Sequence, residues 1–305
     1  MNKITDELLR IVSDFTGTFK GAYNIREDGG CAGRRSSEHI RLSDLPDRPG
    51  LRIDIDPDTR GETVYIPACV TKGDINDVTY NDFYVGAGAD VVIVAGCGVH
   101  TEDGHDARHN GIHRFFIGKG ANVLYKEKHI GTGKGAGGKV IDPVTEIFLD
   151  EGSQMTMDTV QLSGVDTTLR TTKATVKARA KLVVRERLLT DGAEAARTDF
   201  DVTLEGEDSG ADLVSRSVAK GRSRQEFASR IRGNARCTGH SSCDAILADR
   251  GVVIATPALD ATHVDASLIH EAAIGKIAGD QLQKLQTLGL TAEQAEERII
   301  QGFLK

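Results

Sequence analysis

The chain has 305 residues, of which 39% are hydrophobic and 27% charged, and its formal net charge at pH 7 is −7. This length allows a sizeable core in one large domain or two ordinary ones. The negative charge excludes general nucleic-acid binding, which requires a basic face, and the 5% of aromatic residues, with no tryptophan, leave few surfaces for stacking bases.

The apolar runs and the cysteines indicate the compartment. The longest apolar stretches, such as residues 91–95, are far shorter than the roughly 18 residues that a membrane-spanning helix needs. Residues 1–7 lack the apolar core of a signal peptide. The five cysteines are odd in number and lack compact disulfide spacing. We therefore expect a cytoplasmic protein with reduced thiols and no membrane partner.

Residues 1–50 predict a helix followed by a loop region. Apolar residues recur at helical spacing between residues 5 and 15, and Thr5 is placed to serve as the N-cap. The segment that follows, to about residue 60, is polar and rich in glycine and shows little periodicity. We interpret it as loop with short strands.

Residues 51–266 form the predicted core. Polar and apolar residues alternate over many short segments, which indicates strands, and no segment has the pattern of an ordinary helix. A short unit, a turn residue followed by a strand, recurs weakly along this segment. Its four copies begin at Gly88, Gly120, Gly152 and Gly210. Turn-and-strand units without helices between them predict stacked coils, a β-helix or solenoid. A β-sandwich would also alternate, but the repeated turn favours the solenoid.

The glycine-rich segment 133–139 comes close to two nucleotide-binding patterns, Gly-x-Gly-x-x-Gly and the P-loop. Val140 stands where a P-loop needs Ser or Thr to hold magnesium. Both patterns also need a helix directly after the glycines, whereas residues 139–143 predict a strand that ends at proline. We interpret the segment as a connecting loop and expect no ATP hydrolysis by this chain.

One cysteine and four of the nine histidines fall close together. They are Cys97, His100, His105, His109 and His113. The segment lacks a helical stripe, so these side chains would converge on a metal only if a loop wraps; an ordinary polar turn is the alternative. Gly96 and Gly98 flank the cysteine and would let a second chain or a substrate approach its sulfur. Neighbouring imidazoles would lower the thiol pKa.

A second set of ligand-type residues lies near the C-terminus. It comprises His240, Cys243, His270 and Glu271. Thiolate, imidazole and carboxylate are ligands for iron and zinc, although a buried cysteine is often only a small apolar residue. Cys237 and Cys243 lack the close spacing of closed zinc sites. The incomplete set predicts an open or shared site, which two copies in a dimer could complete.

Residues 267–305 predict a C-terminal helical region. Apolar residues follow helical spacing from Ile274, Gly289 is placed as a C-cap, and Thr291 with Gln294 has the spacing of a capping box. The two predicted helices can cap the end of the solenoid or offer a docking surface to a partner.

Three stretches carry a specific family resemblance. They are residues 215–219 (Ser-Arg-Ser-Val-Ala), 239–244 (Gly-His-Ser-Ser-Cys-Asp) and 268–277 (Leu-Ile-His-Glu-Ala-Ala-Ile-Gly-Lys-Ile). They resemble the SufB/SufD family, the core scaffold of the SUF iron–sulfur cluster assembly machinery, and its short SufB-like members most closely. The resemblance implies a right-handed parallel β-helix, a homodimer formed through it, and C-terminal helices that bind a SufC-like ABC ATPase. It also implies that a transient iron–sulfur cluster forms at the dimer interface.

By position, the resemblance matches Cys243 to the interface cysteine of SufB and Glu271 to the carboxylate proposed as its co-ligand. His270 falls where SufD has its interface histidine. Cys97 matches the cysteine proposed to accept sulfur, which would then pass inside the β-helix towards Cys243. His113 lies where the family has a histidine just before the next strand.

The chain also departs from the family. The long N-terminal domain of full-length SufB is missing, which leaves open how a cysteine desulfurase or another sulfur donor docks. The His-rich insert after Cys97 is not SufB-like, and the chain combines SufB-like Cys and Glu with SufD-like His. One polypeptide filling both roles is the implied arrangement.

We therefore expect an assembly scaffold rather than an enzyme, with ATP hydrolysed by a partner subunit. Cys243, Glu271 and His270 would offer ligands to the transient cluster, and His240 would support one of these ligands from the neighbouring turn. A stand-alone metalloprotein that uses the Cys97–His113 loop is the alternative, and a purely structural solenoid is the third possibility.

Overall fold

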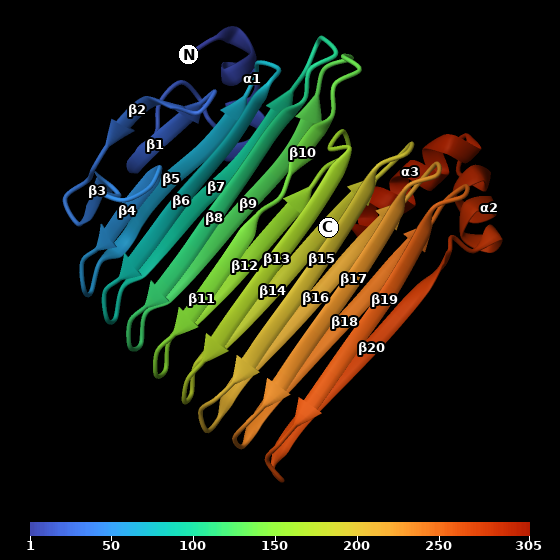
Figure 1. The fold of residues 1–305 in the computed structure, drawn as a ribbon. Helices are drawn as coiled ribbons and strands as arrows, with labels where there is room; N and C mark the ends of the chain where they lie inside the picture. Colours follow the sequence, from blue (N-terminus) through green and yellow to red (C-terminus); the bar gives the residue numbers. More distant parts are fainter.

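The alternating segments pair with segments one coil further along the chain and build two facing sheets (Figure 1). This computed structural model describes all residues, 1–305. The strands of the first half are β1 Ala22–Glu27, β2 Gly30–Arg35, β3 Ile40–Asp44, β4 Gly50–Ile55, β5 Arg60–Val70, β6 Ile75–Val85, β7 Asp90–His100, β8 Ala107–Ile117, β9 Asn122–Thr132 and β10 Lys139–Ile141. The others are β11 Val144–Leu149, β12 Gln154–Gln161, β13 Thr167–Val176, β14 Lys181–Thr190, β15 Ala195–Leu204, β16 Ser209–Ala219, β17 Arg224–Gly233, β18 Cys237–Leu247, β19 Val252–Ala261 and β20 Ala266–Lys276.

The strand order confirms the predicted β-solenoid, which has about eight turns. Sheet A has the order β2-β1-β5-β7-β9-β12-β14-β16-β18-β20. Sheet B has the order β19-β17-β15-β13-β10-β8-β6-β4-β3, with β11 pairing β13 and β8. Two antiparallel hairpins, β1–β2 and β3–β4, form the N-terminal end, and parallel pairing continues from there to β19 and β20. Those last two strands are therefore open edges at the C-terminal end.

The core lies between the two sheets, because alternate residues of each strand point inward. Phe83, Phe115 and Tyr125 are among the largest fully buried side chains. The Phe83 and Phe115 rings stack within sheet B with centroids 4.6 Å apart, and Phe115 contacts Tyr125 of sheet A across the interior with centroids 5.1 Å apart. Burying side chains of this size contributes about 1.5–3 kcal/mol each.

Stacked left-handed turn residues set the repeat. Gly88, Gly120 and Gly152 have φ of +69°, +66° and +68°, and the N–H of Gly88 donates to the carbonyl of Lys119 in the next coil at 2.9 Å. The predicted fourth copy is wrong, because Gly210 lies inside β16 and Asp208, with φ of +58°, occupies the turn. Asp tolerates this backbone region, so the repeat continues without glycine.

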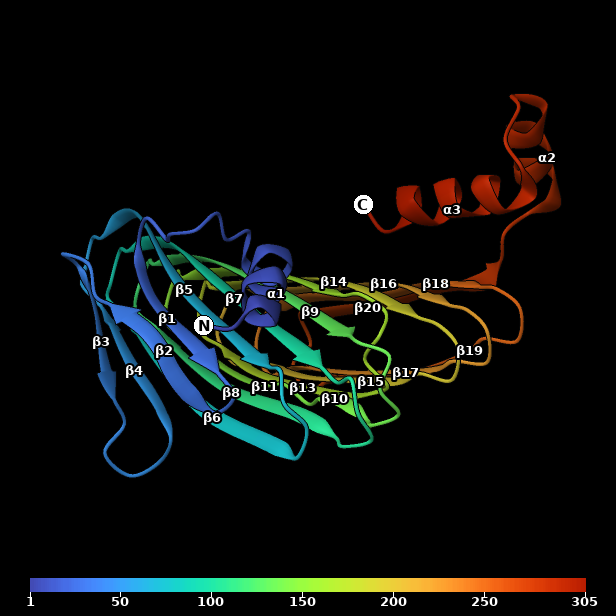
Figure 2. The same ribbon diagram turned by 90° about the horizontal axis from the view of Figure 1, so that it is seen from above.

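Helix α1 (Lys3–Ser13) confirms the predicted N-terminal helix but begins earlier than expected. Its N-cap is Asn2, whose side chain accepts a hydrogen bond from the Thr5 backbone at 2.8 Å, so Thr5 is inside the helix. The helix packs against β5, β7 and β9 on the outer face of sheet A (Figure 2). The short strands predicted before residue 60 are β1 to β4.

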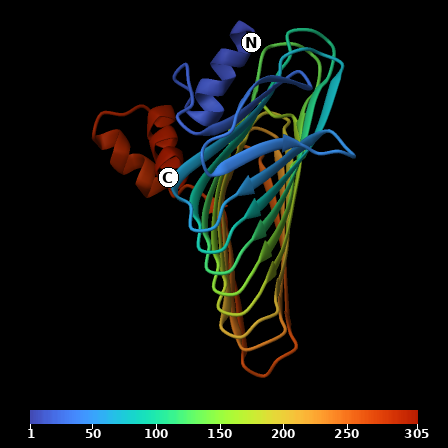
Figure 3. The ribbon, with the colours of Figure 1, turned by 90° about the vertical axis from the view of Figure 1, so that its left-hand side faces the viewer.

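The C-terminal region is strand before it is helix. Residues 266–276 belong to β20, so the predicted helical start near Ile274 is wrong, and helices α2 (Gly279–Thr287) and α3 (Ala292–Phe303) follow. The capping box of Thr291 and Gln294 is present. Both helices lie on the same side of the solenoid as α1 (Figure 3). None of the three helices combines the length and apolar character needed to span a membrane.

The glycine-rich segment behaves as a connection. Residues 133–138 link β9 to β10 without forming a helix, and β10 is the short strand predicted before Pro143. The absence of a helix at these glycines removes the phosphate site that either nucleotide-binding pattern would need.

Candidate functional site

Cys97 points into the solenoid from β7. Its side chain is 4% exposed, and it shares a row with Ala68 on β5 and His129 on β9. Burial, together with the nearby Glu127 carboxylate, raises the pKa of this thiol well above its ordinary value. The expectation that imidazoles lower the pKa is therefore wrong, and the resting group is the thiol.

A small cavity adjoins Cys97. Its volume is ≈ 10 Å³, which is about the space for one water molecule. Its polar lining includes Thr79, Asn81, His109 and His113. A cavity of this size beside a thiol has room for one additional atom of the size of sulfur.

The two glycines that flank Cys97 face the outer side of sheet A, opposite to the Cys97 side chain. A Cβ on Gly96 would lie 2.5 Å from the Val12 carbonyl oxygen, and one on Gly98 would lie 3.0 Å from the Leu8 side chain. Both neighbours belong to α1. The absence of side chains at these glycines therefore lets α1 pack closely against β7. The prediction that they admit a substrate or a second chain is wrong.

The His-rich segment is mostly strand, not loop. His109 and His113 lie on β8 with buried side chains, His100 ends β7, and His105 is exposed in the connecting turn. They do not assemble a metal site: the structure contains no group of three or more His, Cys, Asp or Glu side chains arranged to hold an ion. The convergent loop of the metalloprotein alternative is thus not formed.

A row of buried polar side chains, here called the buried polar track, starts beside Cys97. Its members are His113, Tyr125, Glu127, His129, Arg170, Glu186 and Ser215. His113 Nδ1 lies 2.8 Å from the Tyr125 hydroxyl, which donates to Glu127 Oε1 at 2.7 Å. Arg170 Nη1 donates to Glu127 Oε2 at 2.6 Å, and its Nη2 lies 3.2 Å from His129 Nδ1. The hydrogen bonds thus join β8, β9 and β13 through the interior.

Electrostatics fix the protonation of this first part of the track. Burial alone would raise the pKa of Glu127, but His129 and Arg170 hold it well below its ordinary value. Burial lowers the pKa of His129, and it lowers the pKa of His113 to about 4. The track therefore holds an ionised Glu127–Arg170 pair between neutral imidazoles.

The second part of the track runs towards Cys243. Arg170 Nε lies 3.5 Å from Glu186 Oε1, and the Ser215 hydroxyl donates to Glu186 Oε2 at 2.7 Å. Ser215 pairs directly with Cys243 in the register of β16 and β18. Polar groups therefore extend from the neighbourhood of one predicted cysteine to that of the other.

Cys243 and His270 face inward on adjacent strands. Cys243 is 1% exposed and pairs with Ala272, while His270 pairs with the buried Ser241. Cys243 and His270 are thus diagonal neighbours, roughly 7–8 Å apart between Cα atoms. Neither ring nitrogen of His270 has a hydrogen-bond partner, although both are buried. Burial lowers the pKa of His270, so a neutral imidazole is available as a ligand.

The other two predicted residues lie on the outer face. Glu271 is exposed and follows His270 directly, so strand alternation directs it away from Cys243. His240 also points outward, and its Nδ1 lies 2.7 Å from Asp212 Oδ1. Burial, followed by the charge of Glu186, raises the pKa of the Cys243 thiol to about 12. One chain therefore brings Cys243 and His270 together and leaves Glu271 and His240 on the opposite face of the sheet.

Sequence reasoning missed Tyr125, Glu127, Arg170 and Glu186. Two of them, Tyr125 and Glu127, could have been found from the alternation of β9. If Tyr125 is assigned to the core, the residues that point inward are Val123, Tyr125, Glu127 and His129. A buried acid on a core-facing position requires a buried partner. The partner, Arg170, is 43 residues away and could not be identified without the coil register.

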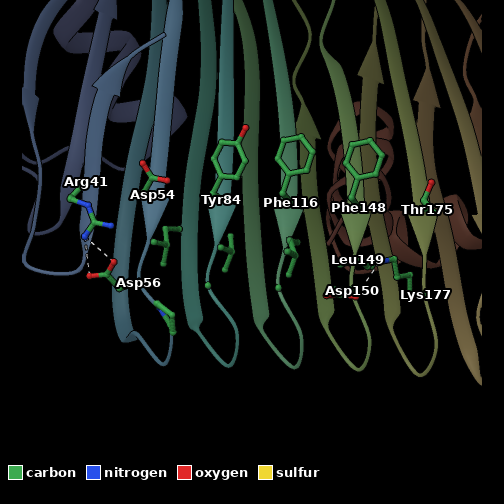
Figure 4. A pocket seen from close by; sticks show the side chains of 16 residues that line it. Arg41, Asp54, Asp56, Tyr84, Phe116, Phe148, Leu149, Asp150, Thr175 and Lys177 are labelled. Carbon is green, nitrogen blue, oxygen red and sulfur yellow. Dashed lines mark hydrogen bonds and ion pairs between the residues drawn. The ribbon is translucent and has the colours of Figure 1, made fainter. Parts of the chain in front are cut away.

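A wide groove lies elsewhere, on the outer face of sheet B (Figure 4). It has a volume of ≈ 450 Å³ and is lined by a ladder of Tyr84, Phe116 and Phe148, whose neighbouring rings are 4.9 and 5.1 Å apart. Its charged rim includes Asp54, Asp56, Asp150 and Lys177. It contains neither the predicted cysteines nor the buried polar track.

Comparisons with known proteins agree on one family. Residues 75–303 match the family model described as SUF system FeS cluster assembly, SufBD core domain. An iron–sulfur cluster assembly SufBD family protein of Methanothermobacter thermautotrophicus is 28% identical over 249 residues, covering 80% of this chain and 59% of the relative. One of Archaeoglobus fulgidus is 27% identical over 273 residues, covering 88% of this chain and 71% of the relative. The chain thus spans about three fifths of the length of the Methanothermobacter relative.

Proposed function

Since this chain belongs to the SufBD family, whose members are named for iron–sulfur cluster assembly, we propose that it is a scaffold on which a transient cluster is built. Cys97 accepts sulfur, and the cluster is assembled near Cys243 and His270 from iron and sulfur as substrates. The chain acts as a non-enzymatic component, and ATP is hydrolysed by a SufC-like ABC-type partner.

The buried polar track carries this proposal. It links the surroundings of Cys97 to Ser215, the register neighbour of Cys243. Burying an ion pair and several neutral polar groups costs free energy that an apolar core would not. Such a track inside a solenoid is expected where a polar or anionic species, such as sulfur in a reduced form, must pass between the two thiols.

The open C-terminal coil supports assembly as a homodimer. β19 and β20 have no strand beyond them, and Leu259, Ile269 and Ile274 on these strands are 40%, 52% and 39% exposed. Unpaired edges with exposed apolar side chains favour association with another chain. Pairing of two copies here brings both sets of Cys243 and His270 to one interface. Glu271, on the outer face of the edge strand, is then available to contact the partner copy.

The C-terminal helices support docking of the ATPase. Helix α2 buries none of its residues, and Leu288, which follows it, is 75% exposed. Helix α3 is held by the buried Ala295 and Ile300 and by an ion pair of 3.0 Å between Glu296 and Lys220. This leaves one helix anchored and the other presented to a partner. ATP binding by that partner would shift the dimer between two arrangements.

Anaerobic reconstitution tests the assignment of the two cysteines. With iron and free sulfide, Cys243→Ser should lose the visible absorption of the cluster, whereas Cys237→Ser, also buried on β18, should retain it. Cys97→Ser should assemble the cluster from free sulfide but not from a persulfide donor. A Cys243→Ser protein that builds as much cluster as the wild type would contradict the proposal. His270→Ala and Glu271→Ala then show which residue ligates.

A further inference from the structure

A second polar pocket opens at the N-terminal end of the solenoid. This N-terminal pocket has a volume of ≈ 350 Å³. Its polar lining includes Asn24, Arg26, Cys31, Arg34, Asp44 and Arg48. Cys31 is exposed, whereas the other four cysteines are buried. Arg26, Arg34 and Arg48 already pair with the carboxylates of Asp77, Asp44 and Asp82, so the pocket offers a small anion guanidinium N–H donors rather than an excess of positive charge.

The N-terminal pocket and the cavity at Cys97 share a wall. Asn24, Arg26 and Thr79 line both. Arg26 is held across this boundary, because its Nη2 lies 2.6 Å from Asp77 Oδ1, and Asp77 Oδ2 in turn lies 3.0 Å from His109 Nδ1. Of the three residues that separate the exposed pocket from the small cavity, Arg26 has the longest side chain, and this side chain reaches both spaces.

The strand register places the two thiols on one line. Cys31, Arg26, Ala68 and Cys97 occupy the same row across β2, β1, β5 and β7. Three strand spacings separate the cysteines by about 14 Å, too far for direct exchange between them. Ala68 contributes only a methyl group, so Arg26 is the large side chain in this row between the pocket and Cys97.

We propose that the N-terminal pocket is the inlet for sulfur, and that it binds a low-molecular-weight persulfide anion which passes Arg26 to reach Cys97. This inference rests on the proposed acceptance of sulfur at Cys97. Arg34 and Arg48, which pair with Asp44 and Asp82, offer the anion their remaining N–H donors, and Arg26 exchanges its contact with Asp77 for one with the incoming negative charge. Asn24, 7% exposed, accepts hydrogen bonds from Cys31 and Arg34 and holds the mouth of the pocket.

The transfer needs no oxidant or reductant. The bound persulfide anion takes the proton of the Cys97 thiol, and the resulting thiolate attacks the terminal sulfur of the now neutral persulfide. A new S–S bond forms at Cys97, the original S–S bond breaks, and the departing thiolate takes up the proton. The products are a Cys97 persulfide and a small thiol. The cavity of ≈ 10 Å³ beside Cys97 offers space for the added sulfur atom.

The exposure of Cys31 allows the inlet to be blocked without a substitution in the core. Wild-type protein is labelled at Cys31 with N-phenylmaleimide, cysteine persulfide is added, and persulfide at Cys97 is followed by mass spectrometry. We expect formation at Cys97 to slow at least tenfold after labelling. Two controls are treated in the same way. Cys31→Ser removes the labelling site, and Cys31→Ser with Val264→Cys carries the label on the turn between β19 and β20, where Val264 is 93% exposed.

A second variant tests whether the Arg26 side chain limits passage from the pocket to Cys97. Arg26→Ala should accelerate formation of the Cys97 persulfide severalfold, while alkylation of the buried Cys243 keeps its wild-type rate and shows that the solenoid has not loosened. Equal rates at Cys97 in labelled and unlabelled wild type, or equal slowing by the label at position 264, would overturn the inlet while leaving Cys97 as acceptor. If unlabelled protein forms no persulfide at Cys97, the assignment of Cys97 itself fails.

Discussion

Ser215 stands directly beside Cys243 in the parallel pairing of β16 and β18, and its hydroxyl donates a hydrogen bond of 2.7 Å to Glu186. One serine therefore connects the thiol at the C-terminal end of the solenoid to a buried carboxylate. Arg170 lies 3.5 Å from the other oxygen of Glu186 and continues the connection towards Cys97. This arrangement makes the interior testable by substitution.

Breaking the central ion pair should be costly. Arg170→Met leaves the carboxylate of Glu127 buried without its cation, and the free energy of unfolding should fall by about 3–5 kcal/mol. Adding Glu127→Gln should recover part of this loss, because the uncompensated charge is removed. Denaturant unfolding of the two variants measures both effects. An Arg170→Met protein as stable as the wild type would contradict the ionised pair.

The buried imidazole of His113 predicts a pH dependence. Its pKa of about 4 in the folded protein lies below the value of about 6.5 in an unfolded chain, so between these values only the unfolded state takes up the proton. Stability is therefore lost as the pH falls from 6.5 to 4, by at most about 1.4 kcal/mol per pH unit from this group. His113→Gln should show a flatter profile in unfolding experiments over that range. Parallel profiles would refute the assignment.

The close packing of α1 against the glycines of β7 predicts that a larger residue there destabilises this part of the protein. Gly96→Ala places a methyl group against the Val12 carbonyl and should destabilise the protein by about 1–3 kcal/mol. It should also expose Cys69, which packs beneath Leu8 and Leu9, to alkylation. Gly275→Ala is the matched control, since nothing lies within 4 Å of the added methyl group. Equal behaviour of the two variants would argue against close packing of α1.

The open coil predicts where a dimer would form. Leu259 pairs with the fully buried Ile231 and yet is 40% exposed, because no strand follows β19. Leu259→Lys should therefore convert a dimer to monomers in analytical ultracentrifugation. Leu169→Lys, at a residue 43% exposed in the middle of sheet B, should leave the association unchanged. Loss of the dimer in both variants, or in neither, would place the interface elsewhere.

Removal of α2 and α3 predicts the loss of ATPase binding. A chain that ends at Lys276 retains β20 and all of the solenoid. It should no longer bind a purified SufC-like ATPase in a pull-down, while Leu288→Glu should weaken binding because it places a charge on the exposed apolar position. Undiminished binding by the shortened chain would exclude the helices as the docking site.

Much of the fold could be predicted from the sequence because strand periodicity is local. The alternation identified the solenoid strands, and Gly88, Gly120 and Gly152 identified their turns. Asp208 was missed because a residue with a side chain replaces glycine at an equivalent turn. The apolar pattern from Ile274 wrongly predicted a helix. β20 lies at an open edge and exposes most of its residues, so burial does not require polar and apolar residues to alternate there.

The site was less predictable because it depends on which strands are neighbours. His270 and Glu271 were expected to act together, but adjacent residues of one strand point to opposite faces. His109 and His113 were interpreted as loop residues because only their place in β8 shows that they are buried. Glu127 and Arg170 meet across two sheets, and nothing in the local sequence of either residue identifies the other.

The two ends of the solenoid differ, and this difference limits how many copies of the chain can associate end to end. The N-terminal end begins with the antiparallel hairpins β1–β2 and β3–β4, whereas the C-terminal end presents unpaired parallel strands. Head-to-tail addition would have to join these unlike edges, and repeated addition of that kind produces filaments. The outer strands of the hairpins, β2 and β3, run antiparallel to their neighbours, so a head-to-tail contact would not continue the parallel pairing. Two C-terminal ends can still meet symmetrically, and such an assembly is complete with its second member.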